Sequence, residues 1–140
     1  MRISKTNPGN KGSLRKGSEP PAATSVHGWR YHHIGIPTDV PRPDEQYLER
    51  FKMYISAFET SPCGIQWMRF EPDSPVHALI KSVPHIAFEV DDLQAALEGK
   101  EILTAPNSPS EGVRVAMILD SGAPVELLEF RRDLSSGSMR

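Results

Sequence analysis

The sequence contains two imperfect copies of one short pattern, and this internal repeat limits the folds open to the chain more than any other feature. Residues 33–36 read His-Ile-Gly-Ile, and residues 85–88 read His-Ile-Ala-Phe, 52 positions later. Residues 64–71 and 124–131 share a second apolar pattern, with Gln66 and Glu126 at equivalent places. Repeated supersecondary units bury their apolar faces against one another. The chain is therefore expected to fold as two related halves.

Strand alternation assigns the side chains of these copies to faces. Successive strand residues point to opposite sides, so His33 shares a face with Gly35, and His85 shares a face with Ala87. By the same rule His32 is expected on the face opposite His33, in a structural or surface role. Each half thus presents one imidazole together with a small residue.

Length and composition predict one folded domain with two loose ends. Residues 27–133 are enough to bury a core, whereas residues 1–26 consist mostly of Gly, Pro, Ser and Lys. We expect residues 1–26 to be a disordered basic tail and residues 134–140 to be frayed. The tail has no interleaved aromatic residues and the rest of the chain is acidic, which disfavours nucleic-acid binding.

The composition also indicates the compartment. No apolar run is long enough to span a membrane, and the first residues lack the apolar core of a secretory signal. The single cysteine, Cys63, has no partner for an internal disulfide. These features predict a cytoplasmic protein with no membrane partner.

Periodicity and punctuation residues predict a mixture of short helices and strands. In the first half we expect strands at 29–36, 51–58 and 65–70 and a helix at 44–50. In the second half we expect a strand from His85, a helix at 92–98 capped by Asp91, strands at 101–104, 112–119 and 124–131, and a loop at 105–112. Helix and strand do not alternate regularly, so the predicted fold class is α+β with mostly antiparallel pairing.

These segments resemble the vicinal oxygen chelate superfamily, which includes glyoxalases, bleomycin-resistance proteins and dioxygenases. The resemblance rests on residues 33–36, 85–93 and 124–129, covers residues 30–131, and is greatest in pattern to methylmalonyl-CoA epimerase and glyoxalase I. It implies a glyoxalase-like fold of paired βαβββ modules, at about 30–75 and 84–131, around a cavity. The first module is reduced.

The resemblance also implies a metal site. Carried over residue by residue, the superfamily's ligand positions fall on His33, Gln66, His85 and Glu126. Two imidazoles, an amide oxygen and a carboxylate suit Zn, Ni, Co, Mn or Fe, and leave positions for water or substrate oxygens. In the epimerase branch a glutamine can occupy the second ligand position, whereas glyoxalase I has a glutamate there.

Proton transfer and substrate contact have candidate residues as well. Glu126 and Glu59 are the candidates for the catalytic base, although Glu59 also fits a simple role in a hairpin turn. The side chains expected to line the cavity and contact a substrate, or else to form plain core, are Tyr54, Met68, Phe70, Met117 and Leu128.

Three functions remain open at this stage. The first is a metal-dependent lyase, isomerase or epimerase acting on a small oxygen-rich substrate. The second is a metal-free protein of bleomycin-resistance type that binds a small molecule. The third is an oligomeric structural module without a ligand. The resemblance implies a homodimer in any of these cases.

Overall fold

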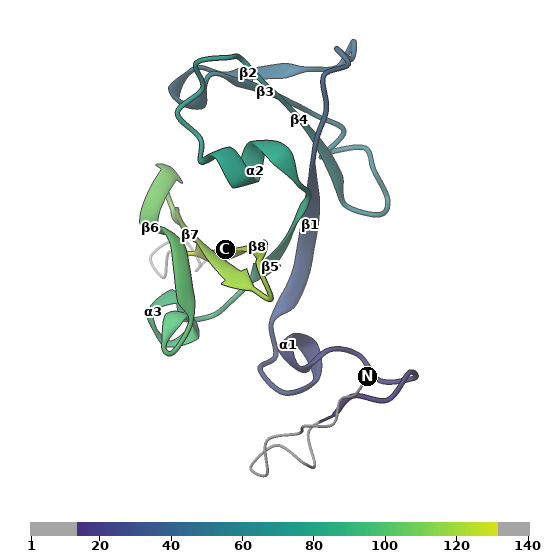
Figure 1. The fold of residues 1–140 in the computed structure, drawn as a ribbon, viewed down its shortest axis with the longest axis vertical. Helices are drawn as coiled ribbons and strands as arrows, with labels where there is room; N and C mark the ends of the chain where they lie inside the picture. Colours follow the sequence, from purple (N-terminus) through teal and green to yellow (C-terminus); the bar gives the residue numbers. More distant parts are fainter. Residues whose placement is uncertain (1–13, 132–140) are drawn as a thin grey trace, which may run out of the picture.

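The structure, a computed structural model, describes residues 14–131 (Figure 1). The predicted tail end at 1–13 and the predicted frayed segment at 134–140 lie outside these residues. The strands are β1 (Arg30–Pro37), β2 (Gln46–Leu48), β3 (Met53–Ser56), β4 (Ile65–Phe70), β5 (His85–Glu89), β6 (Glu101–Ser110), β7 (Val113–Asp120) and β8 (Ala123–Phe130). The helices are α1 (Ala22–Ser25), α2 (Ala78–Ser82) and α3 (Leu93–Leu97), with a 3-10 turn, η2, at Glu49–Phe51.

All eight strands belong to one curled mixed sheet in the order β2-β3-β4-β1-β5-β8-β7-β6. The order is symmetrical about the antiparallel contact of β1 with β5. In each half the first strand pairs in parallel with the last, and the other pairings are antiparallel. Figure 1 shows β2, β3 and β4 at the top of the view, the strands of the second half below them with α2 between, and α1 at the bottom. The predicted α+β class with two repeated modules is confirmed.

The register of the parallel pairs reproduces the sequence repeat residue by residue. Gly35 lies opposite Gln66 in the first module, and Ala87 lies opposite Glu126 in the second. The spacings of 52 and 60 read from the sequence therefore superimpose equivalent positions of two folded units. The first strand of each module also carries a histidine on the inner face of the sheet.

The second module contains the helix α3, whereas the segment predicted as a helix in the first module forms a strand. In the second module α3 begins after Asp92, whose carboxylate Oδ1 accepts a hydrogen bond from the Ala95 amide at 3.1 Å. Asp91, the predicted cap, instead accepts from Arg30 Nη2 at 2.9 Å. The predicted helix at 44–50 is wrong, because Gln46–Leu48 pairs with β3 as a hairpin. A strand ladder across the hairpin outweighs the helical spacing of a few apolar residues.

The predicted loop at 105–112 is also wrong, since β6 continues to Ser110. β6 is an edge strand, where a proline costs no inward hydrogen bond. Its register with β7 shifts on either side of Asn107, and these irregularities accommodate Pro106 and Pro109.

The hydrophobic core lies on the outer face of the second module, under α3. The buried cluster consists of Phe88, Val90, Leu93, Ala116, Ile118, Val125 and Leu127. Ala23 of α1 and Trp29 pack against it, so α1 belongs to the domain although it falls inside the stretch predicted as a tail. Val125 and Leu127 of β8 point into this core, so the alternating residues Glu126 and Leu128 point to the inner face of the sheet. No helix among residues 14–131 has the length and apolar character of a membrane span.

Candidate metal centre

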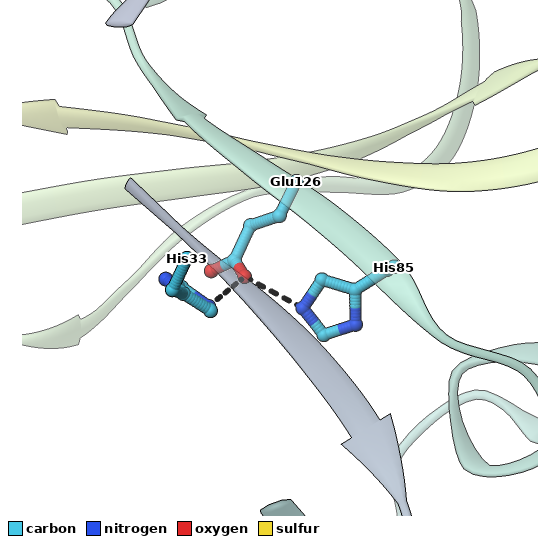
Figure 2. Close-up of side chains that lie close together, drawn as sticks. All are labelled: His33, His85 and Glu126. Carbon is cyan, nitrogen blue, oxygen red and sulfur yellow. Dashed lines mark hydrogen bonds and ion pairs between the residues drawn. The ribbon is translucent and has the colours of Figure 1, made fainter. Parts of the chain in front are cut away.

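Three side chains from three adjacent strands converge on the inner face of the sheet. They are His33 from β1, His85 from β5 and Glu126 from β8 (Figure 2). His85 Nε2 lies 3.0 Å from Glu126 Oε1, and His33 Nε2 lies 3.4 Å from the same oxygen. One ligand atom from each of the three residues falls within 4.8 Å of the others.

The strand register explains why these residues meet. His33 lies opposite Ala87 in the antiparallel pair of β1 and β5, and Ala87 lies opposite Glu126 in the parallel pair of β5 and β8. His85 is two residues before Ala87 and so shares its face. Each histidine therefore faces the small residue of the other module across the central strand pair.

Gly35 makes room for the His85 ring. A Cβ atom at Gly35 would lie 2.4 Å from His85 Cε1 and 2.8 Å from Nε2, far inside normal contact. Because Gly35 is not in a left-handed conformation, its role is to allow the close approach of the ring. The small residue of the sequence pattern thus serves the histidine of the opposite copy.

The site is buried, and its charge is held by hydrogen bonds. Both histidines are 5% exposed, and the Glu126 side chain is 17% exposed. Burial alone raises the pKa of the Glu126 carboxyl, but hydrogen bonds from His33 and His85, and their charge, lower that pKa to about 2. An ionised carboxylate accepts hydrogen bonds and cannot donate them, so both Nε2 atoms carry the proton toward Glu126.

His32 also reaches the cavity, which corrects its predicted placement on the opposite face. The pairing of β1 with β5 shifts register between Tyr31 and His33, so His32 sits in a bulge and does not alternate. Its Nδ1 lies 2.8 Å from His33 Nδ1, and its ring packs between Phe58 and Phe130. Burial and the neighbouring His33 lower the pKa of His32.

The cavity in front of the triad has a volume of about 640 Å³ and receives residues from both modules. Gln66 lines it from β4, on the far side of β1 from His85. Of the predicted wall residues, Met68, Phe70, Met117 and Leu128 line it, and so does Glu59. Glu59 follows β3 at the exposed rim, where no hydrogen bond or ion pair with another residue in the range 14–131 occupies its carboxylate.

Tyr54 is the exception among the predicted wall residues. Its neighbours Met53 and Ile55 line the cavity, so alternation turns Tyr54 to the outer face of β3. There its ring lies 4.2 Å below the Arg69 guanidinium and 4.8 Å from the Tyr47 ring. The sequence did show that Tyr54 alternates with the apolar residues Met53 and Ile55. The predicted strand at 51–58 did not establish which of these two sets faced inward.

Arg50 is a cavity residue that the sequence did not indicate. It lies in η2, the turn between β2 and β3, and its Nη1 donates to the Ser108 carbonyl of β6 at 2.9 Å. β2 and β6 are the two edges of the sheet, so this hydrogen bond joins its two ends.

The triad fits a divalent ion. Neighbouring ligands around an ion with bonds of about 2.0–2.2 Å lie roughly 3.0–3.5 Å apart, which matches both separations from Glu126 Oε1. Two histidines and one carboxylate form a common set for catalytic zinc and non-haem iron. His85 Nδ1, the ring nitrogen that does not face Glu126, is a buried side-chain atom without a hydrogen-bond partner within residues 14–131.

Comparison with known proteins identifies similar folds. No protein-family model and no curated protein matches the sequence. Among solved structures, a hypothetical protein, BH1468, from Bacillus halodurans C-125 has a TM-score of 0.56 at 17% identity, covering 75% of this chain and 96% of that one. Methylmalonyl-CoA epimerase from Mycobacterium tuberculosis has a TM-score of 0.48 at 19% identity, covering 76% and 91%. At these identities the likeness to BH1468 concerns the fold alone.

Proposed function

We propose that this protein binds a divalent metal ion through His33, His85 and Glu126 and is a lyase, isomerase or epimerase of glyoxalase type. The observation that carries the proposal is the convergence of two imidazoles and a carboxylate, from three strands and both modules, at the base of a cavity. Gln66, which lines the same cavity, is the proposed fourth ligand. A bound ion would supply Lewis-acid polarisation of a substrate oxygen.

The chain's own residues then have distinct roles. Glu126 stays ionised at neutral pH because its pKa is about 2, which suits a ligand better than a base. Glu59 lines the cavity and has no hydrogen-bond or ion-pair partner among residues 14–131, and we assign proton transfer to it. His32 holds His33 through the Nδ1 to Nδ1 hydrogen bond, which works in either direction, so it persists when the His33 proton moves from Nε2 to Nδ1.

Metal content tests the proposal first. The full chain, purified without chelator and then loaded separately with Zn, Ni, Co, Mn and Fe, is expected to hold one ion per chain. His33→Ala and His85→Ala are expected to hold none, whereas Tyr54→Phe, on the outer face of β3, keeps the parent's content. Absence of stoichiometric metal under every loading condition contradicts the proposal.

Activity follows from the same samples. Loaded protein is assayed with glyoxal hemithioacetals and acyl-CoA esters, and Glu59→Gln is expected to lose turnover while it keeps the ion. Equal turnover of Glu59→Gln and the parent would instead assign the proton transfer to another group. The homodimer implied by the resemblance is part of the proposal, and light scattering of the full chain tests it.

A metal-free binding protein is the second candidate. Glu126 accepts hydrogen bonds from both histidines, so the triad is satisfied at Nε2 without an ion. The cavity walls are mostly apolar, as a small-molecule binder requires. Ligand binding that persists after exhaustive metal removal, and that is unchanged in His85→Ala, favours this candidate.

A further inference from the structure

The outer face of the sheet is covered by a helix in one module and not in the other. In the second module α3 packs on this face, and Leu93 of α3 is fully buried there. In the first module the segment between β1 and β2, residues 38–45, contains no helix. Among residues 14–131 the buried apolar clusters draw their strand residues from β5, β7 and β8 of the second module. The first module therefore lacks the cover that the second module has.

The sequence repeat allows the two outer faces to be compared position by position. Ile36 corresponds to Phe88 at the spacing of 52, and Trp67 corresponds to Leu127 at the spacing of 60. Phe88 is 7% exposed and Leu127 is fully buried under α3, whereas Ile36 and Trp67 are both partly exposed. Both copies are thus apolar at these positions, but only the second copy supplies its own helix to bury them.

The apolar residues on the outer face of the first module form rows that cross neighbouring strands. Ile86 lies opposite Ile34, and Ile34 lies opposite Ile65, so one row crosses β5, β1 and β4. Ile36 lies opposite Trp67 in the next row. Ile86 is 36% exposed although β5 is a central strand of the sheet. We call these five residues the outer patch, and a continuous apolar surface of this kind marks an interaction site.

The border of the outer patch is aromatic, and its charged residue is already paired. Arg69, the next residue on this face of β4, donates two hydrogen bonds of 2.7 Å to the Glu45 carboxylate and lies over the Tyr54 ring. On the other side Tyr31 is 49% exposed, and its hydroxyl donates to the Cys63 carbonyl. A nucleic acid or a charged peptide gains little from such a surface, and two copies of it do not repel each other.

The outer patch with its border is large enough for a weak but specific contact between two copies. It crosses β5, β1, β4, β3 and β2, which is roughly 20–25 Å, and its three rows extend roughly 15–20 Å along the strands. Two such faces bury on the order of 1,000 Å² in total, which is the lower limit for a specific interface. Sheets pack face to face in many proteins, and a two-fold contact needs only one self-complementary surface.

We propose that the outer patch is the interface through which two copies of this chain pair, with both cavities facing away from the contact. This inference rests on the homodimer included in the proposed function and names its interface, and it is independent of the metal site. The partner covers Ile36 and Trp67 as α3 covers their counterparts in the second module. An interface of this size predicts a dissociation constant of about 1–100 µM.

Sedimentation of the full chain over a range of concentrations measures this pairing. The parent is expected to pass from monomer to dimer between about 1 µM and about 500 µM. Ile86→Lys is expected to weaken the dimer at least about 100-fold, because the two-fold contact buries two unpaired ammonium groups. Ile102→Lys is the matched control, since Ile102 is a 43% exposed strand residue at the far edge of the sheet, and it keeps the parent's dissociation constant.

A second measurement uses the unaltered sequence, so it does not depend on the folding of a variant. Full chain labelled at its isoleucine methyl groups is mixed with unlabelled full chain at a concentration where the dimer predominates. Isotope-filtered NOE spectra then detect contacts between the two copies. The methyl groups of Ile34, Ile65 and Ile86 are expected to show such contacts, and the methyl group of Ile102 is not.

The two measurements separate the interface from the homodimer itself. A parent that remains monomeric at about 500 µM overturns both, whatever its metal content. A dimer that persists in a folded Ile86→Lys, or whose contacts between copies avoid the outer patch, overturns the interface and leaves the homodimer in place. If Ile86→Lys does not fold, the NOE contacts decide alone.

Discussion

The two modules share one strand order, yet they support their histidines in different ways. His33 has a hydrogen-bonding neighbour at His32, whereas the position equivalent to His32 in the second module is Pro84 and His85 Nδ1 has no partner among the described residues. His85 is instead fixed by contact with Gly35. The carboxylate comes from the second module and the neutral amide from the first. The repeat therefore explains the strand order, and the residues that differ between the copies give the site its distinct ligands.

The largest expected effect, on unfolding free energy, comes from replacing Glu126 with glutamine, the residue at the equivalent position 66. In the metal-free protein, Glu126→Gln removes a carboxylate whose folded-state pKa, about 2, lies below its ordinary value of 4.5. The stabilisation from this group is fully present above pH 4.5 and is lost as the pH falls toward 2. The parent is therefore expected to lose up to about 3 kcal/mol of unfolding free energy relative to the variant across this window.

Urea denaturation at pH steps between 6 and 2.5 measures this difference. Glu129→Gln, which removes a carboxylate from the outer face of the same strand, is the control. Parallel stability curves for the parent and Glu126→Gln would show that the histidines do not hold the carboxylate.

The second prediction compares Gly35 with Ala87, the small residues at equivalent positions of the two modules. Gly35→Ala places a Cβ against the His85 ring and is expected to cost about 1–3 kcal/mol of unfolding free energy. Ala87→Gly, the reciprocal change in the other module, creates no clash and is expected to cost about 0.5–1 kcal/mol. Thermal denaturation of both variants checks the order, and equal costs would mean that the His85 ring moves freely away from Gly35.

The third prediction concerns His32, the hydrogen-bonding partner of His33. His32→Phe keeps the ring packing against Phe58 and Phe130 but removes the hydrogen bond to His33, and we expect divalent metal affinity to fall about 10- to 100-fold. The electronic absorption spectrum of the cobalt-loaded protein is expected to change with it.

His32→Gln, which retains a hydrogen-bonding side chain, is expected to recover part of the affinity. A spectrum and an affinity unchanged in His32→Phe would show that His32 only fills space.

The smallest expected effect is on metal affinity, when a carboxylate is introduced into the first module. Gln66→Glu gives both modules an acidic residue at equivalent places, and the added negative charge is expected to tighten divalent metal binding about tenfold. Chelator competition measures the affinity, with Glu45→Gln, an acidic residue outside the cavity, as a control for general charge. No change in Gln66→Glu would indicate that the residue at position 66 is not a ligand.

Much of this arrangement was predictable from sequence because a repeat specifies equivalent positions. Strand alternation placed His33 and His85 on equivalent faces of the two copies, and the resemblance supplied Glu126 as the third ligand position. What the sequence missed depends on pairing between strands distant in sequence. The bulge that brings His32 inward, the irregular edge pairing that accommodates Pro106, and the turning of Tyr54 to the outer face are properties of two strands together and not of either alone.

The hydrogen bond from Arg50 to Ser108 has a consequence for how a molecule reaches the centre. It links two sheet edges that no ladder joins, and it is exposed to solvent. Such a bond contributes only about 0.5–1.5 kcal/mol, so it breaks and re-forms readily at ordinary temperature. Separation of the two sheet edges at this point would therefore break one exposed hydrogen bond and would disturb no strand pairing.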